Sequence, residues 1–237
     1  MILAHNIAHQ LTKQSDPIKK ETLQRFFKTS HGEYGEGDIF LGVTVPKIRT
    51  IAKANKNIAL DEVLKLLHSD IHEHRLIALY FMIQHYKQGD LFLKKQIFEM
   101  YLNNTTYINN WDLVDSSAEY IVGDFLFDKP KDVLFDLAKS NNLWEKRIAI
   151  IATFYFIKKR NHEMTLQIAN LLLDDKHDLI HKAVGWMLRE VAKRCDEEIL
   201  CEYLETNSHK MARTTLRYAI EKLEPTKRIY FLKKDKR

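Results

Sequence analysis

The chain has 237 residues, of which 7 are glycine and 4 are proline, whereas average usage would give about 16 and about 12. Because turns between strands depend on glycine, proline, asparagine and aspartate, this scarcity argues against a β-sandwich, a barrel or a fold with many βα loops. Hydrophobic residues make up 45% of the chain, which is enough for a core and excludes disorder over most of it.

The net charge of +5 is unevenly placed. Residues 225–237 contain six basic residues and one acidic residue, so this tail alone accounts for the +5 and residues 1–224 sum to zero. Basic and acidic blocks alternate within the neutral part, which allows one positive face, although solvated helix surfaces without a target are an alternative. No apolar run approaches the roughly 18 residues of a membrane span, and Cys195 and Cys201 fit neither a disulfide framework nor a zinc site. We therefore expect a cytoplasmic protein.

Helical periodicity covers almost the whole chain. An amphipathic first helix is expected within residues 1–14, and Asp16 before Pro17 predicts the start of a second helix, which continues to about Lys28. Four of the seven glycines fall between Gly32 and Gly42 and predict the one long loop. Val45 and Pro46 restart the helical pattern, and further helices are expected at 59–68, 70–88, 91–105, 110–126, 130–140, 143–159, 163–174, 177–194, 196–205, 210–223 and 226–235.

These segments repeat with a period of 35 to 36 residues. The register is Arg75, Trp111, Arg147, Lys182 and Arg217, each near the start of the second helix of a pair. Two-helix units of about this length are typical of HEAT-like and armadillo-like repeats. The sequence therefore predicts an all-α helical-repeat solenoid with a concave basic groove, forming a single domain over residues 1–237 that ends in a basic helix or tail at 225–237. A plain helix bundle with a coincidental spacing is the alternative.

The register also indicates which side chains share the predicted groove. Four of its five positions are basic, and a row of positive side chains can bind a phosphate backbone by neutralising its charge. Four residues further along each helix, on the same face, stand Leu79, Asp115, Ile151, Trp186 and Glu221. A carboxylate and an indole would thus lie beside Trp111 and the basic positions. The candidate DNA contacts are Lys158, Lys159, Lys182, Arg213 and Arg217.

Several motifs in order resemble a known family. NNWDLVD is followed by LWEKRIAI, KAVGWMLRE and RTTLRYAIE, and the loop YGEGDIFLGV precedes Pro46 and Arg49. Together they resemble the AlkD-like family of DNA alkylation repair glycosylases, from about Lys28 to Glu224. That family is a HEAT-like helical solenoid.

The resemblance implies an activity and roles for particular residues. The reaction would be hydrolysis of the N-glycosidic bond of cationic N3- or N7-alkylated purines in double-stranded DNA. The enzyme would be a monomer that needs no metal, organic cofactor, membrane or obligate protein partner. It would be associated with the nucleoid when bound to DNA. Asp115 would be the catalytic carboxylate, Trp111 and Trp186 would contact the deoxyribose, and Arg147 would contact a phosphate. Arg189, one turn beyond Trp186, would also contact DNA. The resemblance further implies an enzyme that does not enclose the base, and the expected shallow groove offers no obvious pocket.

These residue types suit that chemistry. A cationic base is already a good leaving group, and its departure leaves positive charge on the sugar, which an anion such as Asp115 can stabilise while orienting water. Indole faces also attract positive charge, by about 0.5–2 kcal/mol.

Other interpretations stay open. Trp111 and Trp186 could lie in the core, and Asp115 could cap a helix or pair with Arg147. Trp144 is expected to pack in the core. The protein could also bind damaged DNA without catalysis, or bind another protein. The loop around Tyr34, Glu36 and Asp38 could contact DNA or cover the groove. The His5/His9, His68/His72 and His177/His181 pairs have zinc-like spacing but no evident third ligand, and no P-loop, dinucleotide or serine hydrolase motif is present.

Overall fold

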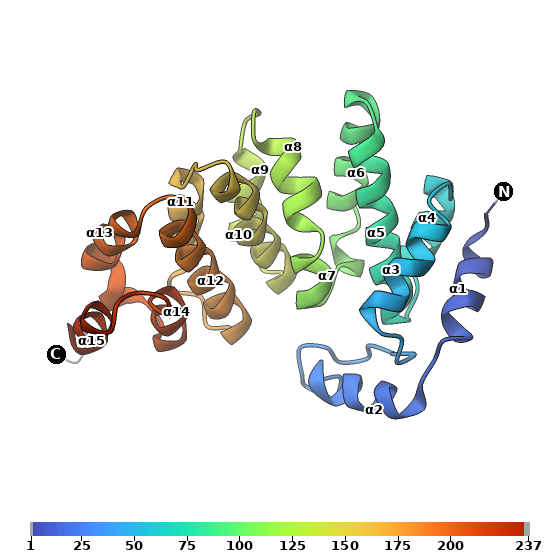
Figure 1. Cartoon of the computed structure of the whole chain (residues 1–237), viewed down its shortest axis with the longest axis horizontal. Coiled ribbons are helices and arrows are strands. Elements are labelled where there is room, and N and C mark those ends of the chain that lie inside the picture. Colours follow the sequence, from blue (N-terminus) through green and yellow to red (C-terminus); the bar gives the residue numbers. More distant parts are fainter. Residues whose placement is uncertain (1, 235–237) are drawn as a thin grey trace. The chain divides into compact units, whose positions relative to one another are not determined.

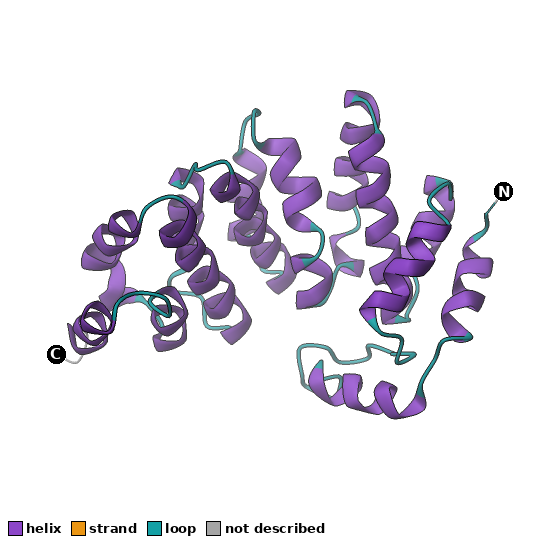
Figure 2. Ribbon diagram, viewed as in Figure 1, coloured by secondary structure: helices purple, strands orange, loops and turns teal. Residues whose placement is uncertain are grey.

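The computed structural model describes residues 2–234. Over that range the chain forms helices and loops, as Figure 2 shows, and one isolated bridge joins Ile39 and Ile71. The all-α prediction is therefore confirmed. None of the helices within the described range is long and apolar enough to cross a membrane. The end of the predicted basic tail, residues 235–237, lies outside the described residues.

The chain divides into two compact units, Met1–Ser117 and Ala118–Arg237. The single repeat domain over residues 1–237 stays a prediction. Both units are built from helices that pack against their neighbours in chain order, such as α4 with α5 and α9 with α10.

The first unit owes its arrangement to one deeply buried helix, α5. Most α5 side chains are buried on every side, which is the pattern of a helix surrounded by others, and α3, α4, α6 and α7 all contact it. The helix α2 begins where predicted, because the Asp16 carboxylate accepts from the N–H groups of Ile18 and Lys19 beside Pro17. The helices (Figure 1) are α1 (Ala4–Thr12), α2 (Pro17–Phe26), α3 (Val45–Ala54), α4 (Leu60–Leu67), α5 (His72–Gln88), α6 (Leu91–Leu102) and α7 (Trp111–Asp115), with a 3₁₀ turn at Thr105–Tyr107.

The second unit is organised around two long helices, α10 and α12, which contact each other. Trp144 is buried at the start of α10, so the prediction that it packs in the core is confirmed. The elements (Figure 1) are a π-helix at Glu119–Gly123, α8 (Asp124–Leu126), α9 (Asp132–Lys139), α10 (Leu143–Lys158), α11 (Glu163–Leu172), α12 (Asp178–Arg194), α13 (Glu197–Asn207), a 3₁₀ turn at Ser208–Lys210, α14 (Arg213–Ala219) and α15 (Pro225–Lys234).

The predicted helices match the observed ones closely, with one clear exception. The helix expected at 110–126 is broken, because α7 ends at Asp115 and the next element is the π-helix. At its end, a Cβ on Gly123 would lie 2.3 Å from the Ala152 carbonyl oxygen of α10. Glycine therefore lets this irregular segment approach α10 more closely than any other residue could.

The basic end of the chain is a helix held by acidic partners. In α15, Lys227 lies 2.7 Å from a Glu197 carboxylate oxygen of α13, and Lys234 pairs with Glu205. The part of the tail that the structure describes is thus a helix that packs on its own unit through these ion pairs.

Candidate functional site

The short helix α7 carries two of the predicted catalytic residues, Trp111 and Asp115. Its start is fixed by Asn110, whose side-chain oxygen accepts from the Trp111 N–H at 2.8 Å. Because Trp111 and Asp115 are four residues apart, they lie on the same face of the helix. Both side chains are partly buried and line one cavity of about 610 Å³ within the first unit.

The cavity is walled by residues from several segments of the first unit. Most of its lining is apolar or aromatic, and polar side chains stand at a few positions. Its walls include Leu23, Phe26, Phe27, Phe40, Val43, Val45, Ile48, Leu76 and Tyr80, and its polar lining includes Lys19, Thr22, Arg49, His72, Glu73, Asp112 and Ser116. The helix α2 and the glycine-rich loop add walls that the register could not reveal, and the expectation that the base is not enclosed stays a prediction.

Trp111 is held by aromatic neighbours on one side of the cavity. The Phe27 ring stacks on the indole, with centroids 5.0 Å apart and an interplanar angle of 17°, and Phe26 meets it edge-on at 5.8 Å. On its other side Phe27 stacks on Phe40 at 5.0 Å. The indole is thus neither a fully enclosed core residue nor a mobile surface group, and its orientation is set by packing.

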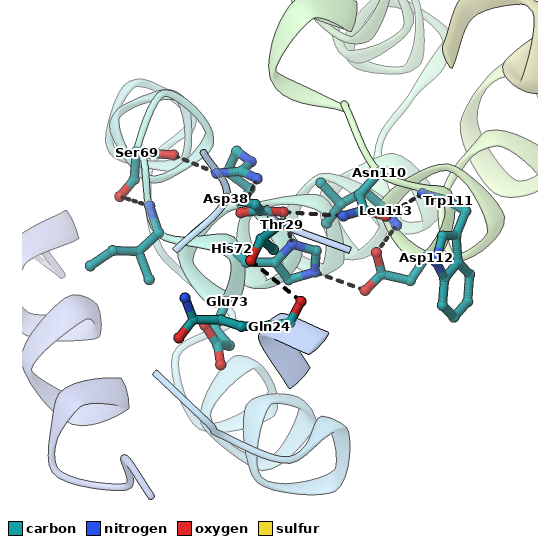
Figure 3. Close-up of polar contacts among 12 residues, drawn as sticks. Gln24, Thr29, Asp38, Ser69, His72, Glu73, Asn110, Trp111, Asp112 and Leu113 are labelled. Carbon is teal, nitrogen blue, oxygen red and sulfur yellow. Dashed lines mark hydrogen bonds and ion pairs between the residues drawn. The ribbon is translucent and has the colours of Figure 1, made fainter. Parts of the chain in front are cut away.

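A buried charged network lies behind Asp112 (Figure 3). One ring nitrogen of His72 lies 2.7 Å from Asp38 and the other 2.8 Å from Asp112. Burial alone would lower the pKa of His72, but the charges and hydrogen bonds of the two carboxylates outweigh it and raise the pKa to about 9. At neutral pH the ring is therefore an imidazolium that donates to both carboxylates and ties the loop at Asp38 to α7.

Asp38 is the centre of this network. Burial would raise its pKa, but His72 and Arg75 hold it below the usual value. Arg75 donates to the second Asp38 oxygen at 2.7 Å and to the Ser69 carbonyl at 3.0 Å. Asn110 also donates to Asp38 (Figure 3), over 3.2 Å. Since Asn110 also caps α7, the same carboxylate that neutralises Arg75 helps to position Trp111.

The glycine-rich loop is fixed by a second buried acid, Glu73. Its carboxylate accepts from the backbone N–H groups of Leu41, Gly42 and Val43 at 2.8–3.1 Å. Gly42 adopts a φ of 85°, and a Cβ there would lie 2.2 Å from the Asp16 carbonyl oxygen, so glycine is required. The end of the loop is thus hydrogen-bonded to α5, and its residues Phe40 and Gly42 line the cavity. Contact of the loop with DNA stays a prediction.

The other two predicted catalytic residues belong to the second unit. Arg147 is buried in α10, and its guanidinium donates to the Leu179 carbonyl at 2.5 Å. Trp186 is partly buried on α12, with its ring centroid 5.8 Å from that of Phe154. The structure thus brings Trp111 and Asp115 together, whereas the roles of Arg147 and Trp186 in the same site stay predictions.

The predicted DNA contacts of the second unit are mostly exposed and partnered within the unit. Lys182 lies 2.7 Å from Asp178, and Arg189 pairs with Glu221. Lys158 pairs with Glu119, and Lys159 lies 5.5 Å above the Tyr155 ring. Arg213 donates to the Leu232 carbonyl at 3.3 Å, and Arg217 is exposed.

The five register residues occupy the helix positions that the repeat predicts, but not all of them form a positive surface. Arg75 lies in α5, Trp111 begins α7, and Arg147, Lys182 and Arg217 lie in the first turns of α10, α12 and α14. Arg75 and Arg147 are only 4% and 5% exposed. Both are hydrogen-bonded to acceptors within the protein, and the concave basic groove stays a prediction.

Sequence reasoning missed Asp38, His72, Glu73 and Asp112 as positioning residues. The sequence marked His72 only as one member of the His68/His72 pair, whose spacing resembles a zinc site. In the structure His68 instead contacts the Asn104 side chain at 2.6 Å. Within residues 2–234, no group of three or more histidine, cysteine, aspartate or glutamate side chains is placed to hold a metal ion.

A family model described as DNA alkylation repair enzyme matches residues 7–223. The chain belongs to this family. No curated protein matches the chain, but solved structures share its fold. A protein described as a predicted DNA alkylation repair enzyme from Enterococcus faecalis is 15% identical with a TM-score of 0.68, covering 90% of this chain and 98% of that one.

Two structures from Streptococcus mutans are also similar. AlkD2 is 16% identical with a TM-score of 0.55, covering 86% of this chain and 97% of its own. The protein smu.31 of strain UA159 is 17% identical with a TM-score of 0.56, covering 93% and 99%. At these identities the structures show a shared helical-repeat fold, and the family membership rests on the match over residues 7–223.

Proposed function

We propose that this member of the DNA alkylation repair family is a DNA glycosylase that hydrolyses the N-glycosidic bond of cationic N3- or N7-alkylated purines in duplex DNA. The observation that carries the proposal is the placement of Asp115 beside Trp111 on one face of α7, lining the same cavity. A fold supports many functions, so the proposal rests on this site and on the family rather than on the helices.

The proposed reaction needs an anion near the sugar. The bond between C1′ and the purine nitrogen breaks, its electron pair neutralises the cationic base, and positive charge develops on the deoxyribose. The Asp115 carboxylate stabilises that charge, while water adds to C1′ and loses a proton to the carboxylate or to solvent. The Trp111 indole, held in place by Phe27, adds attraction between its π face and the cation.

The neighbouring acids Asp112 and Glu73 have structural tasks. Asp112 accepts from the His72 imidazolium, and Glu73 accepts from three backbone N–H groups. Both are therefore neutralised or hydrogen-bonded in a way that fixes α7 and the loop. Asp115 lies on the face of α7 that lines the cavity with Trp111.

The second unit would supply the contacts with the DNA backbone. We assign Trp186 to the deoxyribose and Lys182 and Arg189 to phosphates, with Lys158, Lys159, Arg213 and Arg217 as further cations. Arg147 is 5% exposed and donates to the Leu179 carbonyl, so its assignment to a phosphate requires its guanidinium to exchange this acceptor when DNA binds. Exposed ion pairs such as that between Lys182 and Asp178 are worth less than about 1 kcal/mol. A phosphate can therefore replace the carboxylate at little cost, and binding should weaken steeply with salt.

The proposal is tested by release of free methylated purine from alkylated duplex DNA. Asp115→Asn keeps the size of the side chain and removes the charge, so excision should fall by about 100-fold or more while duplex binding is retained. Glu99→Gln, which neutralises an exposed carboxylate on α6, is the matched control and should retain full activity. Absence of base release by the wild-type protein, with DNA binding intact, would instead indicate a non-catalytic binder of damaged DNA.

A further inference from the structure

Charge is sorted by helix at the end of the second unit. The helix α13 contains four acidic residues and no basic one, whereas α15 contains four basic residues and no acidic one. Between them in the chain, α14 contains two arginines and no acidic residue. The family model ends at residue 223, so the basic helix α15 lies beyond the part of the chain that the model matches.

Two of the four cations of α15 hold this helix on α13. Lys227 lies 2.7 Å from a Glu197 carboxylate oxygen, and Lys234 pairs with Glu205. Phe231 lies on the same side of the helix, between the two lysines, and is 2% exposed. This side of α15 is therefore used for packing within the unit.

The other two cations lie on the outer side of α15. With about 100° of rotation per residue, Ile229 lies opposite Phe231, and Arg228 and Lys233 lie on either side of Ile229. Ile229 is 51% exposed, and both basic side chains are exposed. The ion pairs of the packing side thus hold the helix with Arg228 and Lys233 towards solvent.

The helix α15 is also joined to α14, which carries two of the candidate DNA contacts. Arg213 donates to the Leu232 carbonyl of α15 at 3.3 Å, and Figure 1 shows the two helices next to each other. Arg217 lies one turn beyond Arg213 on the same face of α14, and Arg228 lies one turn before Leu232 on the same side of α15. Exposed arginines of two helices therefore lie along one surface of the second unit.

We propose that the outer side of α15 binds the phosphate backbone of duplex DNA through Arg228 and Lys233, next to the phosphates that α14 contacts. The inference rests on the DNA binding of the proposed function and not on its catalysis. Within the second unit α10 contacts α12, α12 contacts α14, and α15 adjoins α14. The phosphates bound by α15 would therefore lie at one edge of the DNA segment that this unit contacts, where they add affinity without reading sequence.

Other partners fit this surface less well. A basic amphipathic helix can bind an anionic membrane, but it then needs its apolar side free, and Phe231 is buried against the unit. A protein partner would bury a larger apolar core than Ile229 provides. A polyanion, in contrast, is bound by exposed cations alone.

The first test compares two double variants that remove the same charge. Arg228→Gln combined with Lys233→Gln should weaken binding of an undamaged duplex about tenfold or more and reduce the slope of log K against log salt by about 1.8, or about 0.9 for each lost phosphate contact. Lys95→Gln combined with Lys139→Gln changes exposed lysines of α6 and α9. This matched control should keep the wild-type affinity and slope. Fluorescence anisotropy at several salt concentrations measures both quantities.

Thermal unfolding separates DNA binding from a purely structural role of α15. Terminal helices of repeat proteins need a polar outer face, and both changed side chains are exposed, so we expect the same Tm for the wild-type protein and the α15 double variant. An unchanged salt slope in that variant, with or without a lower Tm, would overturn the inference.

Vesicles test the membrane as an alternative partner. Cosedimentation with vesicles of phosphatidylglycerol and phosphatidylcholine should be equally weak for the wild-type protein and the α15 double variant. Vesicle binding that is lost in the variant, while DNA affinity is unchanged, would overturn the inference in favour of a membrane surface.

Excision assays distinguish failure of this inference from failure of the proposed function. A wild-type protein that releases no base, but whose salt slope falls in the α15 double variant, would support the contact by α15 and contradict the glycosylase. A wild-type protein that excises 7-methylguanine, but whose slope is the same in the variant, would contradict the contact and leave the glycosylase proposal standing.

Discussion

The two units of the chain use charge in different ways. In the first unit, Asp38, His72, Arg75 and Glu73 are buried and bonded to one another or to the backbone. In the second, charged groups such as Lys182 and Asp178 pair mostly at the surface. A buried network costs much to break and holds one geometry, whereas a surface pair costs little and can exchange partners. The first unit is thus suited to positioning a reacting group and the second to holding a polyanion.

The largest expected effect is on the stability of the first unit. Asp38→Asn would leave buried Arg75 and His72 without their shared carboxylate, so we expect a loss of about 3–5 kcal/mol in the free energy of unfolding. Urea unfolding and hydrogen exchange of residues in α5 and α7 would measure it. Glu99→Gln should change stability by less than about 0.5 kcal/mol. A change of less than about 0.5 kcal/mol for Asp38→Asn as well would contradict the claim that the first unit depends on a buried charged network.

The protonation of His72 gives a pH dependence with a definite sign. Its pKa rises from an ordinary value near 6.5 to about 9 in the folded protein. Protonated His72 therefore contributes fully to the free energy of unfolding below about pH 6.5, and this contribution is lost as the pH rises towards 9. The total loss is on the order of 3 kcal/mol. Unfolding measured across this range should show the loss in the wild-type protein and not in His72→Gln. A wild-type stability that is flat from neutral to alkaline pH would show that the network is not charged.

The smallest effects on stability are expected in the second unit, where DNA affinity is the sensitive measure. Glu221→Gln removes the partner of Arg189, so stability should change by less than about 1 kcal/mol while affinity for duplex DNA rises. Arg189→Gln should lower affinity and reduce the slope of log K against log salt by about 0.9. Fluorescence anisotropy at several salt concentrations tests both. Unchanged affinity and slope in both variants would exclude Arg189 as a phosphate contact.

The helices could be predicted from sequence because their signals are local. The Asp16 cap with Pro17, the restart at Val45 and Pro46, and the apolar runs of α5 and α10 each act within a few residues, and the structure places helices there. The π-helix at Glu119–Gly123 was not predictable in the same way, because it depends on the close approach of Gly123 to α10. That contact joins residues distant in sequence.

The site was predictable only where a motif carried it. Trp111 and Asp115 follow from the motif NNWDLVD and the register, and the structure brings them to one cavity. The burial of Arg75 does not follow, since its partner Asp38 lies 37 positions away in an irregular loop. The cavity was missed for the same reason: its walls come from α2, the loop, α3, α5 and α7, and no single segment shows it.

The most direct test of the central claim is single-turnover excision of 7-methylguanine from a defined duplex, measured together with duplex affinity, for the wild-type protein and Asp115→Asn. We expect release of the free base by the wild-type protein, a rate lower by about 100-fold or more in Asp115→Asn, and similar duplex affinity for both proteins. Equal rates of base release by the two proteins would contradict the assignment of Asp115 as the catalytic carboxylate.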